Sequence, residues 1–203
     1  MLTEQEQFWR QDFGNEYVSR NRVDWKVRVP FWQDIIERTK PKSILEIGCG
    51  SGWNLRAIRE VDDMISAWGC DINQTALQEA SDAGVSVFEA SVLDIYAAEI
   101  FDSGMCSNPR FDLVASVGVL IHVSPTDLPR AMDQIISASN RYVLAVEYAD
   151  ETEVEVEYRG NAKRLWRRPF GRLYEERGLK LVAEFDAPAD AFDRCRVWIM
   201  ERP

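Results

Sequence analysis

Closely spaced cysteines, long apolar runs and all but one histidine are missing from this sequence. The four cysteines, at positions 49, 70, 106 and 195, form no C-x-x-C pair, which argues against a zinc site or a disulfide framework. No apolar run approaches the roughly 20 residues that span a bilayer, and the acidic, polar N-terminus does not resemble a signal peptide. We therefore expect a protein of the reducing cytoplasm, without a metal site and without a membrane partner.

Positive charge is also scarce, except in one stretch. The net charge of −10 opposes binding to nucleic acid or to an anionic membrane. Residues 159–172 nevertheless contain six cations and no acid. These cations either clamp an anionic substrate through arginine forks or neutralise the acidic residues just upstream on a solvated surface. They are Arg159, Lys163, Arg164, Arg167, Arg168 and Arg172.

What the sequence does contain is a glycine motif that follows a buried-strand pattern. An apolar run at residues 44–47 leads into Gly48, Gly50 and Gly52, and a helix-compatible segment at residues 53–61 follows at once. A strand, a glycine loop and a helix in this order begin a βαβ unit that binds a nucleotide. Glycine lets the backbone approach a ligand where a Cβ would collide, and the start of the helix presents unpaired N–H groups to the same place.

The spacing of the motif distinguishes between nucleotides. A dinucleotide fingerprint needs a third glycine where this chain has Trp53, and an acid, Glu46, precedes the glycines. Asp71 ends the next apolar stretch, about twenty residues further on, where a ribose-binding carboxylate is expected. With residues 46–52 as the first motif and residues 70–72 as the second, the chain resembles the class I S-adenosylmethionine (SAM) dependent methyltransferases.

This resemblance implies a cofactor and the residues that bind it. SAM would be the cofactor and S-adenosylhomocysteine (SAH) the product. The glycine loop would hold the methionyl part, Asp71 the ribose and Ile72 the adenine, with further contacts from the loop after the third strand and from the N-terminal segment. The residues expected to bind SAM are Glu46, Gly48, Cys49, Gly50, Gly52, Asp71, Ile72, Ser91, Val92, Tyr17 and Asn21.

Strand and helix patterns alternate from residue 44 onward, which predicts a parallel sheet with helices on both faces. The expected fold class is α/β: a Rossmann-like, seven-stranded, mostly parallel sheet whose last hairpin is antiparallel. Residues 1–203 should form a single domain, with a helical cap at 1–41 that contains helices at 3–20 and 30–39. Residues 148–168 should form an insertion near the acceptor site, with an exposed strand at 152–158 and a turn at 159–161.

Several stretches also resemble a narrower group, the methylases associated with pseudaminic acid biosynthesis. This closer resemblance implies a small-molecule methyltransferase that acts on or near a sugar or a sugar-derived acid. The stretches are residues 8–9, 13–17, 21–22, 118–122, 139–142, 147–148 and 154–160.

Polar residues just beyond the strand ends are the catalytic candidates. His122, the single histidine, follows the fourth predicted strand, on the rim of the expected site. With an ordinary pKa of about 6.5 it could serve as a general base, or it could simply line the pocket. Glu147 and Tyr148, at the end of the fifth strand, are the other candidates, and Glu147 could instead cap a neighbouring loop. A base is needed only if the nucleophile arrives protonated. For substrate binding we expect Arg159, Tyr158, Arg22 and Arg168.

The predicted function is SAM-dependent methylation, on oxygen or nitrogen, of a small anionic acceptor such as a sugar-derived acid, a carboxylate or a phosphonate. The protein would act as a monomer or homodimer, without a nucleic-acid partner. One alternative is an NAD(P)-dependent oxidoreductase, which Trp53 and the lack of a Tyr-x-x-x-Lys pair disfavour. Another is a catalytically silent SAM-binding protein, which the polar residues at the strand ends disfavour.

Overall fold

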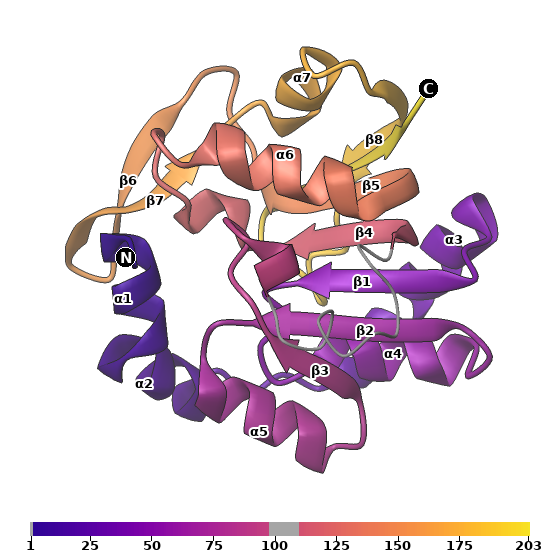
Figure 1. Cartoon of the computed structure of the whole chain (residues 1–203), viewed down its shortest axis with the longest axis horizontal. Coiled ribbons are helices and arrows are strands. Elements are labelled where there is room, and N and C mark those ends of the chain that lie inside the picture. Colours follow the sequence, from indigo (N-terminus) through magenta and orange to yellow (C-terminus); the bar gives the residue numbers. More distant parts are fainter. Residues whose placement is uncertain (1, 98–109) are drawn as a thin grey trace.

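The computed structural model describes residues 2–97 and 110–203. The sequence also predicts a loop at 102–110, rich in Gly, Ser, Asn and Pro, and this segment lies almost wholly outside the described residues. The centre of the structure is a seven-stranded sheet with the strand order β3-β2-β1-β4-β5-β9-β8 (Figure 1). The strands are β1 (Ser43–Ile47), β2 (Ser66–Asp71), β3 (Ser86–Glu89), β4 (Phe111–Val117), β5 (Ser139–Tyr148), β8 (Lys180–Asp186) and β9 (Cys195–Glu201).

The pairing of these strands confirms the predicted fold class. Strands β3, β2, β1, β4 and β5 are parallel to their neighbours, whereas β9 runs antiparallel to both β5 and β8. The order reverses at β1, because β2 lies on one side of it and β4 on the other. In an open α/β sheet, ligands bind beyond the carboxyl ends of the strands at such a reversal.

Helices cover both faces of the sheet because successive strand residues point to opposite faces. Ile44 packs with α3 (Val29–Thr39) and α4 (Trp53–Val61) on one face. Leu45 and Ile47 belong to the core on the other face, which α6 (Leu128–Ala138) and α7 (Phe170–Glu175) cover. A further helix, α5 (Gln74–Asp82), packs beside β2 and β3. None of the described helices is long and apolar enough to cross a membrane.

The N-terminal segment forms two helices, α1 (Glu4–Arg10) and α2 (Asp12–Arg20), rather than the single helix predicted at 3–20. The helical backbone is interrupted at Gln11, with φ −105 and ψ −149. The chain bends there so tightly that a Cβ on Gly14 would lie 1.8 Å from the carbonyl oxygen of Trp9. Glycine at position 14 therefore permits the close approach of α2 to the end of α1.

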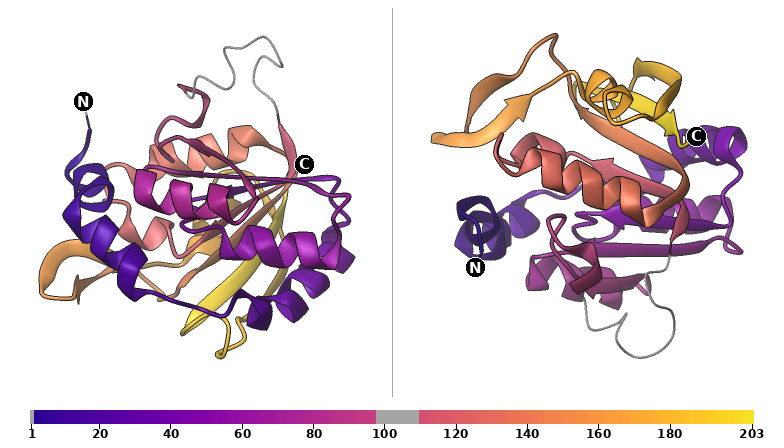
Figure 2. Two further views of the ribbon diagram at one scale, coloured as in Figure 1. Left: turned by 90° about the horizontal axis from the view of Figure 1, so that it is seen from below. Right: turned by 45° about the horizontal axis from the view of Figure 1, so that its top comes forward.

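A two-stranded hairpin, β6 (Val154–Tyr158) and β7 (Asn161–Arg167), forms a sheet of its own. The sequence indicated the first strand and the turn but not β7, because cations obscure the alternation of apolar and polar side chains there. Figures 1 and 2 show α1, α2 and the hairpin at the same end of the molecule, towards which the arrowheads of β1 and β4 point. The side-chain amide of Gln5 donates to the carbonyl oxygen of Lys163 at 3.3 Å, which ties α1 to β7.

Candidate active site

A cavity lies between the carboxyl ends of β1, β2 and β4 and the N-terminal helices α1 and α2. Every residue expected to bind the cofactor lines this cavity except Gly52. Gly52 instead stands at the start of α4, where a Cβ would lie 2.8 Å from a methyl group of Val85. The fold thus brings together residues from four separate parts of the sequence, although their part in binding stays a prediction.

The glycine loop is shaped by close contacts on one side and by free space on the other. Gly48 has a φ of +64, and a Cβ there would lie 2.4 Å from Val119, so only glycine fits. Gly50 has a φ of +53 and faces open space, with no atom within 4 Å of an added Cβ. The Asp71 carboxylate holds the loop, because it accepts from the backbone N–H of Gly50 at 2.9 Å and from that of Asn73 at 2.8 Å. Each of its oxygens has a further lone pair to offer the cavity.

Two polar side chains at the inner end of the cavity, a glutamate and an arginine, each have one atom without a hydrogen-bond partner. Glu46 is almost completely buried; one of its carboxylate oxygens accepts from Asn54 at 2.6 Å, and the other has no partner among the described residues. Arg28 donates to the side-chain oxygen of Asn54 at 3.0 Å, while its Nε is buried without a partner. Because buried polar groups are normally hydrogen-bonded, these two groups fit the ammonium and carboxylate ends of a bound amino acid. Nothing in the sequence singled out Arg28, which stands in no motif.

Burial sets the protonation state of Glu46, and this gives a test in the ligand-free protein. Burial raises the pKa of Glu46 from 4.5 to about 8, although Asn54 and Arg28 oppose this rise. Between these two values the folded protein binds more protons than the unfolded chain, so the free energy of unfolding falls as pH rises from about 4.5 to 8. Each pH unit between the two pKa values corresponds to about 1.4 kcal/mol. The Glu46→Gln variant should therefore gain stability relative to the natural chain as pH rises.

Urea denaturation at pH 5 and at pH 8.5 measures this gain. The exposed Glu60 provides the control, because Glu60→Gln should leave the pH profile of the natural chain unchanged. Burial also raises the pKa of Glu147, to about 7. Glu147 therefore lowers the free energy of unfolding over the same pH range, and this contribution is the same in the natural chain and in Glu46→Gln. Parallel profiles for the natural chain and Glu46→Gln would contradict the expectation.

His122 reaches the cavity from the opposite side, on the short 3-10 turn Leu120–His122 that follows β4. Its Nδ1 lies 2.6 Å from the backbone carbonyl oxygen of Arg164 in β7. Its ring packs beside those of Trp9 and Tyr158, with centroids 4.5 Å and 4.9 Å away, and these two rings also contact each other. Burial lowers the pKa of His122 to about 4, so the imidazole is neutral at pH 7.

A comparison with protein families identifies the family of this chain. A family model described as a methyltransferase domain matches residues 24–184. The chain belongs to this family. It is a class I SAM-dependent methyltransferase, and the strand order of its sheet is that of the Rossmann-like methyltransferase fold. Membership in this family excludes the NAD(P)-dependent oxidoreductase alternative. Trp53, which stands where a dinucleotide fingerprint needs its third glycine, agrees with this.

Solved structures of other methyltransferases share the fold of this one. They include the magnesium protoporphyrin IX methyltransferase (ChlM) from Synechocystis PCC 6803 with bound SAH, with a TM-score of 0.68, 11% identity and 98% of each chain covered. The sugar N-methyltransferase KedS8 from Streptoalloteichus sp ATCC 53650 has a TM-score of 0.64 and 13% identity, over 95% of this chain and 93% of that one. The mitomycin 7-O-methyltransferase MmcR has a TM-score of 0.68 and 13% identity, over 99% of this chain and 61% of that one. No curated protein matches the sequence.

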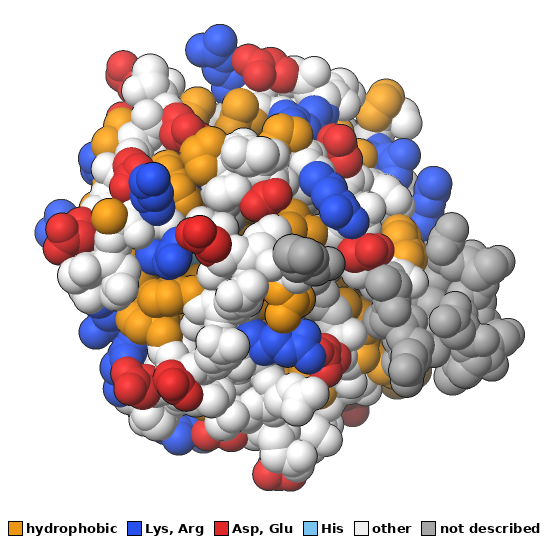
Figure 3. All heavy atoms as spheres, turned by 60° about the vertical axis from the view of Figure 1, so that its left-hand side comes forward, with side chains coloured by type: hydrophobic (Ala, Val, Ile, Leu, Met, Phe, Trp, Pro, Cys, Tyr) orange, Lys and Arg blue, Asp and Glu red, His pale blue; other side chains and the backbone are white. Residues whose placement is uncertain are grey.

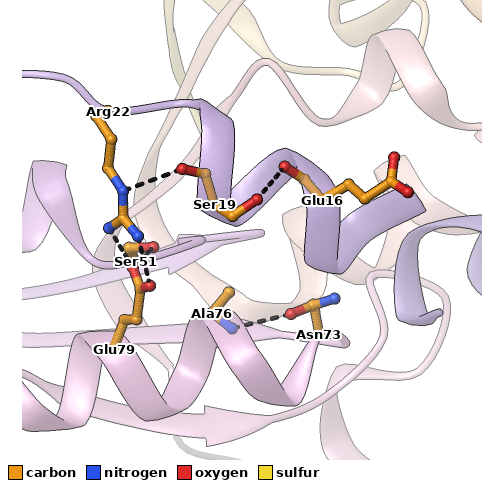
Figure 4. Close-up of polar contacts among 7 residues, drawn as sticks. All are labelled: Glu16, Ser19, Arg22, Ser51, Asn73, Ala76 and Glu79. Atoms are coloured by element: carbon orange, nitrogen blue, oxygen red, sulfur yellow. Dashed lines mark hydrogen bonds and ion pairs between the residues drawn. The ribbon is translucent and has the colours of Figure 1, made fainter. Parts of the chain in front are cut away.

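Hydrogen bonds join the segment after α2 to α5 and to the glycine loop, beside the cavity of the methyltransferase. Both Nη atoms of Arg22 donate to the carboxylate of Glu79 at 3.0 Å, and the Ser51 hydroxyl donates to the same carboxylate at 2.9 Å (Figure 4). Nearer the N-terminus, the Ser91 hydroxyl donates to Glu6 of α1 at 2.5 Å. Arg22, expected to bind substrate, is therefore exposed and joins the end of α2 to α5, outside the described cavity lining.

Glu147 and Tyr148 do not have the catalytic positions expected of them. Glu147 is fully buried and accepts from the backbone N–H groups of Val119, Leu120 and Ile121 at 3.2, 3.1 and 3.4 Å. Glu147 thus caps the turn that carries His122. Capping of a neighbouring loop was the alternative that the sequence allowed for this residue. The Tyr148 hydroxyl donates to Asp193 at 2.6 Å. Neither side chain is among the described residues that line the cavity.

Arg168, also expected to bind substrate, holds the other end of the same turn. It is completely buried and donates to the carbonyl oxygens of Leu120 at 2.8 Å and Val123 at 2.9 Å. Its Nε donates to Glu153 at 2.7 Å. A carboxylate at the amino end of the Leu120–His122 turn and a guanidinium at its carboxyl end match the polarity of a helical turn. Arg168 is thus buried against this turn and is not among the described residues that line the cavity.

The other cations of residues 159–172 mostly pair with acids on the surface. Arg164 lies 3.7 Å from Glu4, Arg167 lies 3.1 Å from Asp150, and Arg172 lies 3.0 Å from Glu176. Figure 3 shows acidic and basic side chains interspersed over this side of the molecule. Surface ion pairs therefore account for these three arginines better than an anion clamp does, although their partners are not the acids at 151, 153, 155 and 157 that the sequence suggested.

Tyr158 and Arg159, the remaining expected substrate residues, lie at the tip of the hairpin. The Tyr158 ring packs against Trp9 and His122, behind the cavity. The exposed Arg159 lies over the Tyr158 ring, with its guanidinium carbon 5.9 Å from the centroid. Neither belongs to the described cavity lining, so Tyr158 can affect a substrate only through the side chains in front of it.

Proposed function

We propose that this methyltransferase transfers the methyl group of SAM to a small molecule bound between the N-terminal helices and the Leu120–His122 turn. One observation carries this proposal: a single cavity extends from the glycine loop and Asp71 to the side chains of Trp9, Tyr17 and His122. The first part of this lining suits the cofactor. The second part is aromatic and lies where an acceptor would meet the methyl group.

The residues of the chain act mainly by positioning the two reactants. When bound, SAM supplies a methyl group that is already activated for transfer, so orientation can provide much of the rate, up to about 7–11 kcal/mol. Glu46 and Arg28 would hold the amino-acid end and Asp71 the ribose. Ile72 and Val92 would pack on the adenine.

The charge of the cavity lining favours an uncharged acceptor over the anionic one expected from the sequence. The lining contains the carboxylates of Glu6, Asp71 and Asp127, and Arg28 is its one cation among the described residues. Glu46 adds little negative charge at pH 7, because burial raises its pKa to about 8. Arg28 lies beside Glu46, at the end assigned to the cofactor. An acidic lining attracts the positively charged sulfonium and repels an anionic acceptor.

A sugar is the acceptor that we propose. Flat aromatic side chains such as Trp9 and Tyr17 combine apolar faces with polar edges, which suits a ring that carries hydroxyl groups. The resemblance to pseudaminic acid-associated methylases points the same way, and one similar structure is by its name a sugar N-methyltransferase. We further propose that residues 1–203 form one domain in which the cap at 1–41 and the insertion at 148–168 enclose the acceptor. A cytoplasmic location and a monomeric or homodimeric state stay predictions.

Calorimetric titration with SAM, SAH and NAD tests the cofactor part of this proposal. Saturable binding is expected for SAM and SAH and none for NAD, and the two binding ligands should raise the melting temperature. Mass spectrometry then tests the acceptor part, as a gain of one methyl group across neutral sugars, amino sugars, sugar acids and phosphonates. Binding without transfer to any compound would favour the catalytically silent alternative, and transfer to phosphonates alone would overturn the uncharged acceptor.

A further inference from the structure

The tautomer of His122 is fixed by the backbone of the hairpin. Its Nδ1 lies 2.6 Å from the carbonyl oxygen of Arg164. A carbonyl oxygen can only accept a hydrogen bond, so Nδ1 must carry the proton. A neutral imidazole has one N–H group, and its second nitrogen is then an acceptor. Nε2 of His122 therefore has an unprotonated lone pair.

The surroundings of His122 leave this lone pair available to a ligand. Nε2 makes no hydrogen bond with any residue in the described part of the chain, and the side chain lines the cavity. The neighbouring rings of Trp9 and Tyr158 pack against the imidazole. Burial also lowers the pKa of His122 to about 4, so protonation does not remove the acceptor at neutral pH.

We infer that the acceptor group that receives the methyl carries a hydrogen, as a hydroxyl or an amine does, and donates it to Nε2 of His122. This inference rests on the proposed function and narrows its substrate class. A carboxylate or phosphonate oxygen would point one lone pair at another. It would exclude water from Nε2 without offering a donor, which costs about 1–3 kcal/mol. The site thus selects against the unprotonated nucleophiles that the sequence also allowed.

The transfer step balances with the groups named. The acceptor oxygen or nitrogen forms the new bond to the methyl carbon, and the bond from that carbon to sulfur breaks with its electron pair passing to sulfur. A hydroxyl oxygen becomes strongly acidic as it gains positive charge, so even a weakly basic Nε2 can accept its proton late in the step. The proton then leaves the imidazole for water. An amine can retain its proton and needs Nε2 only for orientation.

The hairpin therefore acts on the acceptor through its backbone and not through its exposed cations. The Arg164 carbonyl sets the tautomer, and Arg168, just past the end of β7, holds the carbonyl oxygens of Leu120 and Val123 on either side of His122. The first contact comes from β7, the strand that the sequence did not reveal, and the second from the residue that follows it.

Nitrogen-15 NMR of the full chain tests the tautomer directly, because the sequence contains one histidine. The spectrum at pH 7 should show one imidazole with a protonated Nδ1 and an unprotonated Nε2. A protonated Nε2, or an imidazolium, would overturn the inference. This measurement needs neither SAM nor an acceptor.

A pair of variants then tests what the lone pair does. Asn in His122→Asn can still donate to the Arg164 carbonyl but offers no acceptor in place of Nε2, whereas Gln in His122→Gln is long enough to place an amide oxygen there. We expect His122→Asn to bind SAM within about two-fold of the natural chain and to lose about 10²–10⁴-fold in methyl transfer, with partial recovery in His122→Gln. Full activity in His122→Asn would contradict the inference.

The acceptor panel separates failure of the inference from failure of the proposed function. If the natural chain binds SAM and methylates only carboxylates or phosphonates, the inference is wrong and the methyltransferase function stands. If the chain does not bind SAM, the proposed function itself fails. Transfer to hydroxyl or amine groups, with loss in His122→Asn, supports both.

Discussion

Replacing Asp71 with alanine should weaken SAM binding by about 10- to 100-fold, the loss expected for about 1.5–3 kcal/mol of hydrogen bonding to a charged group. The Asp71 carboxylate lines the cavity and also accepts from the backbone N–H groups of Gly50 and Asn73. Its loss removes the contact proposed for the ribose and releases the glycine loop. Calorimetric titration with SAM and SAH measures the effect.

Asp112 offers a matched control for this variant. Its carboxylate accepts from the backbone N–H of Lys42 at 2.8 Å, a contact of the same kind at the amino end of the sheet, away from the cavity. Asp112→Ala should lose a similar amount of stability and retain its affinity for SAM. Equal affinities of Asp71→Ala and Asp112→Ala would show that Asp71 does not hold the cofactor.

Replacing Arg168 with methionine should destabilise the fold by about 2–5 kcal/mol. Methionine fills a similar volume, but it leaves the carbonyl oxygen of Val123 without a donor in the interior, at about 1–3 kcal/mol. It also removes the charged donor of the Leu120 carbonyl, worth about 1.5–3 kcal/mol, which then accepts only from the backbone N–H of Val123. The turn that carries His122 would lose the guanidinium at its carboxyl end and keep Glu147 at its amino end. We therefore also expect slower methyl transfer with unchanged affinity for SAM, because the cofactor side of the cavity is untouched.

Arg172 provides the control for this second variant. It is exposed and pairs with Glu176 one turn further along α7, and surface pairs of this kind contribute about 0–1 kcal/mol. Arg172→Met should therefore change neither stability nor transfer. Urea denaturation of both variants, followed by kinetics with SAM and an acceptor, makes the comparison. An Arg168→Met variant as stable as Arg172→Met would refute the structural role assigned to Arg168.

Local patterns predicted the parts of this protein that depend on local physics. The strand, glycine loop and helix at residues 43–61 could be recognised because a buried parallel strand must be apolar and a left-handed turn favours glycine. Asp71 followed from its spacing after that motif. The pattern of Thr3 followed by Glu6 also predicts a capping box, and the structure contains it, because both of its hydrogen bonds lie within one turn of helix.

Long-range contacts, by contrast, decided most of the candidate site. Arg28 faces Glu46, 18 residues further along (46 − 28), and nothing nearby in the sequence marks either as the partner of the other. Glu147 and Arg168 have the charges expected of substrate-binding residues, yet both are buried against one turn. Whether a charged side chain meets a ligand or a backbone end depends on which segment packs over it.

The sequence by itself thus determined the βαβ start, the cofactor class and the presence of one histidine after the fourth strand. Only the tertiary structure decided which nitrogen of that histidine is protonated, because the carbonyl that fixes it belongs to residue 164, 42 positions away. It also decided that the cations of residues 159–172 serve the protein's own surface and backbone. The physical reason is common to both: hydrogen-bond geometry and burial arise between segments that packing brings together, and no spacing along the chain records them.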